Sequence, residues 1–188
     1  MLQDGRVVQT VELLLDKVSE ALVREQWDVL AAAGLPSQAM HNGPANRPHV
    51  TLVAQPVMDD DREPDLRELL TGLPVPVRLG SITCFGRDRY VLVRALVASV
   101  ELLRLQTRVF DLVGGEGARE LMRPGRWMPH VTLAHRLSAE QVGRALAVLH
   151  GSDETDGYAV SARRWDSDAR REWPLGPTPA HRAWPPGP

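Results

Sequence analysis

One five-residue string occurs twice in this chain, and it carries side chains suited to acid–base chemistry. Pro-His-Val-Thr-Leu occupies residues 48–52 and again residues 129–133. An identical string repeated within 188 residues indicates an internal duplication. The ordinary pKa of histidine, about 6.5, allows one ring to be neutral while another is protonated at the same pH. His49 and His130 are therefore candidates for a matched base and acid.

The spacing inside the string predicts how these side chains are presented. Successive side chains of a β-strand point to opposite faces. His49 and Thr51 would then share one face, while the valine and leucine of the string are buried on the other. His130 and Thr132 repeat this arrangement in the second copy. If a pseudo-two-fold axis relates the copies, the two His-Thr pairs face a common point.

Two imidazoles that face one point have three interpretations. In the first they act on a phosphodiester: the neutral ring takes a proton from the nucleophile, the protonated ring gives one to the leaving oxygen, and the threonine hydroxyls bind the non-bridging oxygens. In the second they bind zinc, but no Cys, Asp or Glu close in the sequence completes a ligand set. In the third they are structural residues of two strands. The duplication favours the first.

The elements that must position these residues follow from hydrophobic periodicity and turn residues. Two helices are expected to end at glycines, one at Gly34 and the other at Gly114-Gly115, and Ser138 is expected to cap the last helix. Residues 36–48 are expected to form a polar loop. The predicted strands span residues 6–16, 49–55, 75–84, 89–97, 129–136, 158–166 and 171–175, and the predicted helices span residues 17–33, 59–70, 101–113 and 139–150.

Several residues near the repeated string are weaker candidates. Arg47 and Arg126 are expected to bind phosphate, and Arg123 is a lesser candidate, although an isolated arginine is more often a surface residue. Trp127 and Tyr90 could stack on a base, but core packing is the simpler expectation for both. Strand alternation places His135 on the face opposite His130. We interpret the remaining histidines as surface or satisfied core residues: His41, His135, His150 and His181.

Composition narrows the class of partner. The chain has 22 basic and 24 acidic residues and a formal net charge of −2. This balance argues against an extended basic surface that binds the phosphates of duplex nucleic acid. A short RNA end or a cyclic nucleotide remains a possible partner because one phosphate and one or two bases suffice for its recognition. A single cysteine, Cys84, excludes an intramolecular disulfide. No apolar run reaches membrane-spanning length, and we expect a monomer in the cytoplasm.

The repeated string and its surroundings resemble the 2H phosphoesterase superfamily, and in detail its 2'-5' RNA ligase and cyclic phosphodiesterase branch. The resemblance rests on RPHVTLVAQP (residues 47–56) and WMPHVTLAHRL (residues 127–137), on the opening VELLLD and on the closing RRWDS and EWPLG. It covers residues 7–175, and we expect residues 1–175 to form a single bilobal domain. Residues 176–188 are expected to be a proline-rich disordered tail.

The resemblance implies an α+β fold of two pseudo-symmetric lobes, each an antiparallel sheet flanked by helices, with the active-site cleft between them. It also implies hydrolysis of 2',3'-cyclic phosphates to 2'-phosphates without metal, ATP or other cofactor, and a reversible 2'-5' RNA ligase activity that joins a 2',3'-cyclic end to a 5'-hydroxyl. His49 would be the proton donor, His130 the proton acceptor, and Thr51 and Thr132 the phosphate binders. Two alternatives stay open: hydrolysis of another phosphodiester, such as a 2',5'-oligonucleotide or a small cyclic nucleotide, and non-catalytic binding of an RNA end or nucleotide.

Overall fold

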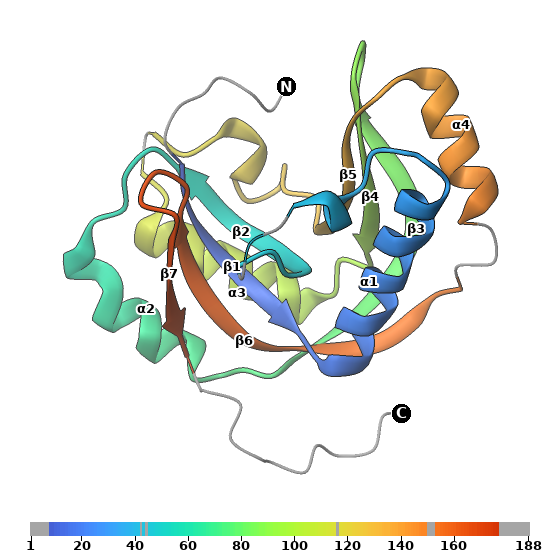
Figure 1. Ribbon diagram of the computed structural model, residues 1–188. Helices are drawn as coiled ribbons and strands as arrows, with labels where there is room; N and C mark the ends of the chain where they lie inside the picture. Colours follow the sequence, from blue (N-terminus) through green and yellow to red (C-terminus); the bar gives the residue numbers. More distant parts are fainter. Residues whose placement is uncertain (1–7, 42, 44, 116, 150–152, 177–188) are drawn as a thin grey trace.

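Seven strands and four α-helices make up the fold, which we describe from a computed structural model (Figure 1). The structure describes residues 8–41, 43, 45–115, 117–149 and 153–176. The strands are β1 (Gln9–Leu15), β2 (His49–Gln55), β3 (Val75–Gly86), β4 (Tyr90–Leu96), β5 (His130–Leu137), β6 (Thr155–Asp166) and β7 (Arg171–Leu175). The α-helices are α1 (Lys17–Ala32), α2 (Glu63–Leu70), α3 (Val100–Val113) and α4 (Ala139–Val148).

Three of the four helices, α1, α3 and α4, begin where a side chain accepts hydrogen bonds from free backbone N–H groups. The Asp16 carboxylate accepts from the first turn of α1, and Ser99 does so for α3. Ser138 and Gln141 cap each other reciprocally at the start of α4, as expected from the serine at this position. Gly34, which follows α1, has a φ of 67°, a conformation that favours glycine.

Most element bounds match the expectation to within two residues. β6 begins three residues earlier than expected, β1 three residues later and α2 four residues later. Three short 3-10 helices in the described residues were not expected: η1 (Gln38–Met40), η2 (Asp60–Arg62) and η3 (Glu120–Met122). η2 lies where the acidic run was expected to open a helix. His150 and the tail from residue 177 lie outside the described residues, so neither expectation can be compared with the structure.

All strands are antiparallel and belong to one sheet that divides into two lobes. The order is β1-β2-β5-β4-β3-β6-β7, and β6 additionally pairs with β1. The first half of β6 pairs with β3, and its second half pairs with β1 and β7. One long strand therefore joins the lobe of β1, β2 and β7 to the lobe of β3, β4 and β5. This confirms the predicted α+β fold with two sheet lobes and flanking helices.

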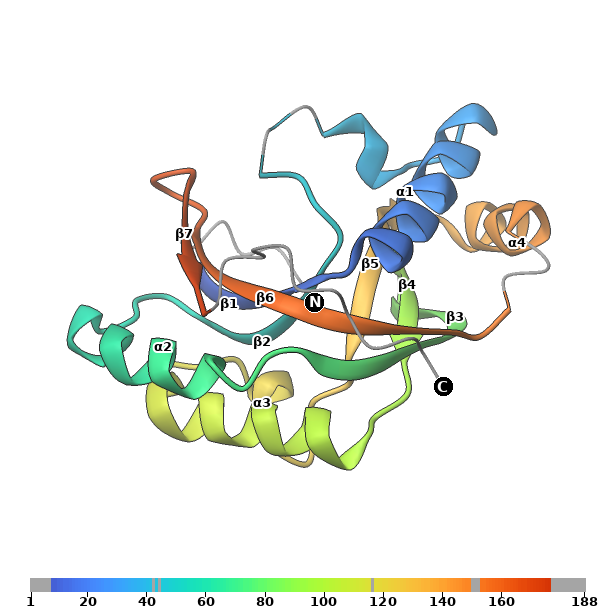
Figure 2. The same cartoon turned by 90° about the horizontal axis from the view of Figure 1, so that it is seen from below.

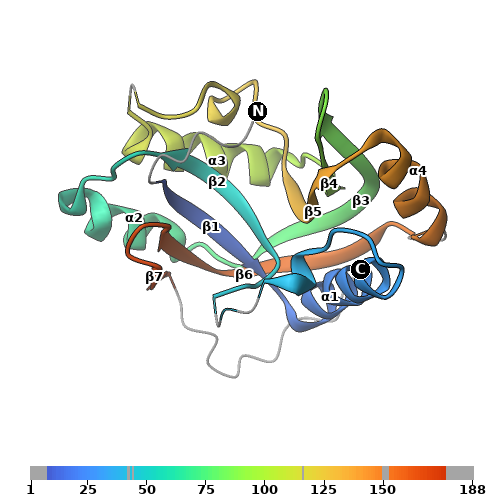
Figure 3. The same cartoon turned by 45° about the horizontal axis from the view of Figure 1, so that its top comes forward.

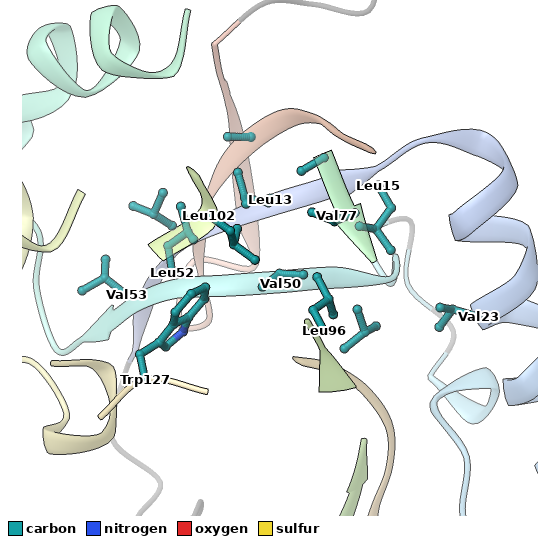
Figure 4. Close-up of a cluster of buried hydrophobic side chains, with 14 of the residues drawn as sticks. Leu13, Leu15, Val23, Val50, Leu52, Val53, Val77, Leu96, Leu102 and Trp127 are labelled. Atoms are coloured by element: carbon teal, nitrogen blue, oxygen red, sulfur yellow. The ribbon is translucent and has the colours of Figure 1, made fainter. Parts of the chain in front are cut away.

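Each lobe has its own pair of helices. α2 contacts α3, and α3 lies against β2 on one side of the sheet, while α1 and α4 contact each other and lie against β5 (Figure 2). Buried leucines and valines from both lobes form one core. Val50 and Leu52 of the first string lie in it together with Trp127 (Figure 4). None of the helices in the described part of the chain is long and apolar enough to cross a membrane.

Candidate active site

The two copies of the string meet at a single antiparallel strand pairing between the lobes. β2 and β5 approach each other between the lobes (Figure 3). They pair through Val50 and Val131. Extended by one residue each way, this antiparallel register sets His49 beside Thr132 and Thr51 beside His130. The local two-fold axis of the pairing passes between the valines and exchanges the two copies.

Burial confirms the predicted alternation. Val50 and Val131 are buried at 0% and 1% exposure, whereas the four His and Thr side chains are only partly buried. The His and Thr residues are one residue away from the paired valines, so they share the opposite face of the sheet. Two imidazoles and two hydroxyls are thus brought together, as the duplication predicted.

Both imidazole rings are oriented in the same way. The Nδ1 atom of His49 is 2.7 Å from the carbonyl oxygen of Arg47, and that of His130 is 2.7 Å from the carbonyl oxygen of Met128. A carbonyl oxygen can only accept, so Nδ1 donates its proton in each ring. Nε2 of each histidine is therefore left for a proton transfer.

Two buried tryptophans support the two motif strands symmetrically. The Trp127 indole donates to the carbonyl oxygen of Thr51 at 2.9 Å, and the Trp27 indole donates to the carbonyl oxygen of Thr132 at 3.0 Å. Both rings are almost fully buried. Trp127 is thus a core residue, as the simpler of the two expectations had it, and Tyr90 is partly buried against the same core.

The surroundings of the two histidines are not symmetric. Phe85 at the end of β3 meets the His130 ring edge-on, with centroids 5.0 Å apart. Burial lowers the pKa of His130 below 6.5; the bond to the Met128 carbonyl opposes this, and the charge of His49 adds to the lowering. His49 instead faces a carboxylate: its Nε2 is 3.5 Å from Oε1 of Glu12 on β1. The surroundings of His130 therefore favour its neutral form, whereas His49 lies beside a carboxylate.

The arginines chosen from the sequence are engaged in ion pairs. Arg47 contacts Glu20 of α1 at 2.9 Å, and Arg126 contacts Glu120 of η3 at 3.2 Å. Arg123 contacts the same Glu120 at 2.9 Å. Sequence proximity to the motif does not determine where these long side chains point, and a phosphate role for Arg47 and Arg126 stays a prediction.

His135 corrects the expectation drawn from strict alternation. β5 carries two irregularities against β4, since Thr132 pairs with Val93, Ala134 with Leu92 and Leu137 with Tyr90. The extra residue between Thr132 and Ala134 exchanges the faces of the side chains that directly follow it, and His135 is one of them. His135 lies close enough to His49 and His130 for both to influence it: burial lowers its pKa, and the charges of neighbouring groups, these two rings among them, lower it further. It is a third histidine near the site.

Two hollows in the described surface lie elsewhere. One, of about 500 Å³, is lined by residues around Gln55 and Gly114, and the other, of about 440 Å³, by residues around Arg164 and Trp173. Neither is lined by His49 or His130, so we place the site by the geometry of the reactive groups. Within the ranges given above, no cluster of three or more His, Cys, Asp or Glu side chains forms a metal-ion site.

Comparison with solved structures finds a similar fold in several proteins. E. coli LigT complexed with 3'-AMP is 22% identical, with a TM-score of 0.56, over 89% of this chain and 94% of that one. TT0787 of Thermus thermophilus is 18% identical, with a TM-score of 0.54, over 89% and 94%. Usb1 of Kluyveromyces marxianus is 12% identical, with a TM-score of 0.51, over 89% and 97%.

Sequence comparison gives the family. No curated protein matches the chain. The family model of the 2'-5' RNA ligase superfamily matches residues 19–169, which include both copies of the string. The chain belongs to the 2'-5' RNA ligase superfamily of 2H phosphoesterases.

Proposed function

We propose that this protein is a phosphodiesterase that opens 2',3'-cyclic phosphates of RNA ends or nucleotides to 2'-phosphates, with His49 as acid and His130 as base. Membership of the superfamily supports phosphodiesterase-type activity. The observation that carries the finer proposal is the pairing of Val50 with Val131, which gathers two imidazoles and two hydroxyls on one face. A site that only binds has no need of two titratable rings in different environments.

The proposed reaction needs one proton removed and one supplied. Neutral Nε2 of His130 takes a proton from water as the water oxygen attacks phosphorus. The bond from phosphorus to the 3'-oxygen breaks, and protonated Nε2 of His49 gives its proton to that oxygen. The product is a 2'-phosphate with a free 3'-hydroxyl. With a 5'-hydroxyl in place of water as the attacking group, the same step forms a 2'-5' linkage and frees the 3'-hydroxyl. The reversal of that step restores the 2',3'-cyclic phosphate and the 5'-hydroxyl.

Different environments support this assignment of roles. A base must be neutral at working pH, and burial favours the neutral form of His130. An acid must be protonated, and Glu12 stabilises positive charge on His49. Two positive rings so close repel each other, which further favours one neutral and one charged ring.

The phosphate is proposed to lie between the two pairs. The hydroxyls of Thr51 and Thr132 donate to its non-bridging oxygens and stabilise the charge that develops in the transition state. Arg47 and Arg126 can take part only if they exchange their ion pairs with Glu20 and Glu120 for the phosphate. Because those pairs are partly exposed and therefore weak, such an exchange costs little. A small nucleotide substrate agrees with the 3'-AMP bound to E. coli LigT.

The substrate and the independence from metal are tested in one assay. We expect the purified protein to convert 2',3'-cyclic nucleotides and a cyclic-ended oligonucleotide to 2'-phosphates at the same rate with and without EDTA. Phosphorus NMR distinguishes the 2'- from the 3'-phosphate product. Turnover of a 2',5'-linked dinucleotide alone would redirect the substrate assignment, and binding without turnover would contradict catalysis. Loss of activity in EDTA, restored by a divalent ion, would establish the metal interpretation instead.

The pH dependence of turnover should be bell-shaped. The acid limb of kcat/KM reports protonation of the base. Since the pKa of His130 is lowered, this ring stays neutral to lower pH, and the acid limb is expected below pH 6.5. Replacing Phe85 by alanine admits water to the ring, which should move the acid limb to higher pH while the alkaline limb stays in place. A flat profile between pH 5 and 8 would contradict two-histidine catalysis.

A further inference from the structure

A buried chain of charged groups runs from His49 across the first lobe. Glu12 receives a hydrogen bond from Nε of Arg163 on β6 at 2.7 Å, and both side chains are 4% exposed. Arg163 also contacts Glu172 of β7 at 2.5 Å. Burying such charges is costly unless each has a partner, so their presence beside the site calls for a reason.

The geometry determines how Glu12 acts on His49. Nδ1 of His49 is hydrogen-bonded to a carbonyl group, and the carboxylate lies beside Nε2, the nitrogen left free for a proton transfer. At 3.5 Å the contact is too long for a strong hydrogen bond. The oxygen Oε1 already accepts the Thr10 hydroxyl at 2.7 Å. Glu12 therefore stabilises positive charge on the ring without binding its proton, and the proton stays available for the substrate.

The carboxyl of Glu12 is held in its charged form. Burial raises its pKa, but the charges of His49 and Arg163, with hydrogen bonds from Thr10 and Arg163, outweigh burial and hold the pKa below its ordinary value. Glu12, Arg163 and Glu172 together carry one excess negative charge. A positive charge on protonated His49 would neutralise this excess negative charge.

Other charged groups that face His49 act in the opposite direction or are already engaged. His130 and His135 of β5 are near enough to interact with it, and their positive forms would repel an imidazolium. Arg47, two residues before His49, is directed to Glu20 of α1. Glu12 is the carboxylate that the structure places against the ring.

The second copy of the motif has no carboxylate at the position that corresponds to Glu12. Across the β1–β2 pairing Glu12 lies opposite Thr51, and across the β4–β5 pairing Val93 lies opposite Thr132. The two positions are equivalent under the local two-fold axis, yet one holds a carboxylate and the other an aliphatic side chain. The duplicated site is symmetric in its histidines and threonines and asymmetric in the neighbouring strand.

We propose that Glu12 and Arg163 are positioning residues that stabilise the protonated form of His49 and so fix it as the acid of the pair. This inference rests on the proposed function for its catalytic consequence. Arg163 anchors the carboxylate and moderates its charge, so that Glu12 does not strongly repel an anionic substrate. The two strings are identical and so do not tell which histidine is the acid and which the base. The carboxylate of Glu12 beside the first string, in place of Val93 beside the second, makes that distinction.

The test compares two opposite charge changes with a matched control. In Glu12→Gln the alkaline limb of kcat/KM should move to lower pH by about one unit, because an opposite charge within 4–6 Å shifts a titration by about 1–3 units. In Arg163→Gln, which leaves the carboxylate less shielded, the limb should move to higher pH. Arg164→Gln removes the adjacent arginine of β6, which pairs with Asp60, and should leave the limb unchanged. General damage to the fold would not shift the alkaline limb of the pH profile to lower pH in one variant and to higher pH in the other.

A second readout needs no substrate. The ring signals of His49, followed by NMR, should titrate at a lower pH in Glu12→Gln than in the unchanged protein. If the unchanged protein turns over no cyclic phosphate, the proposed function fails, while this titration still decides the role of Glu12. An unaltered His49 titration in Glu12→Gln overturns the inference. If that variant does not fold, the direction of the shift in Arg163→Gln decides, and a downward or absent shift overturns it.

Discussion

Replacement of His49 or His130 by asparagine is expected to lower kcat/KM for a 2',3'-cyclic phosphate by about 10²–10⁴-fold, the usual contribution of a positioned acid or base. Each ring leaves Nε2 free for a proton transfer, and asparagine can neither take nor give a proton at neutral pH. KM should change much less than kcat, because the threonines remain to bind the phosphate. Kinetics at several pH values measure both effects.

The control for this loss of activity is the thermal stability of each variant, which shows whether the fold is intact. Both histidines are partly exposed on a strand whose other face is buried, so asparagine should cost little stability. Thermal unfolding of each variant should be close to that of the unchanged protein. A variant that keeps its melting temperature and more than a tenth of the activity would exclude that histidine from the chemistry.

Replacement of Trp127 or Trp27 by alanine is expected to cost about 3–5 kcal/mol of unfolding free energy, the usual range for a buried tryptophan. Each ring fills the core and each indole donates to the carbonyl of a motif threonine, at 2.9 Å and 3.0 Å. Phenylalanine at either position should cost less, since it keeps most of the apolar contact and loses the donor. Urea unfolding monitored by circular dichroism gives the free energies.

Trp173 on β7 provides the comparison for these variants. Its ring is partly exposed and is covered by Arg164 and Arg171, so Trp173→Ala should cost less than either core substitution. The core tryptophans should also affect catalysis under conditions in which the variants stay folded, because they hold the strand segments that carry the reactive groups. Equal costs at all three positions would contradict a supporting role for Trp27 and Trp127.

Much of the site could be predicted from the sequence because its determinants are local. Strand alternation depends on adjacent residues alone, and it correctly placed His49 with Thr51 and His130 with Thr132. The predicted cap at Ser138 likewise depends on a few consecutive residues. The duplication then supplied the long-range step, since the two identical strings are paired directly in the sheet.

The parts that could not be predicted depend on strand register between distant segments. Glu12 lies in an apolar strand, and only the pairing of β1 with β2 and β6, including an irregularity beside Glu12, brings it to His49 and Arg163. His135 was placed on the wrong face because alternation takes no account of the irregularities in β5. The sequence offered one signal for this residue: Glu12 is a charged residue within the otherwise apolar run Val11–Leu15, which is unusual for a strand of the core.

The central claim is that His49 and His130 act as one unit on a phosphodiester, and a double variant tests it most directly. Residues that act in one step are strongly non-additive. We predict that His49→Asn/His130→Asn has a kcat/KM for a 2',3'-cyclic nucleotide no more than about tenfold below the weaker single variant. If the two losses multiply instead, or if either single variant keeps the activity of the unchanged protein, the two rings do not share a reaction and the central claim is wrong.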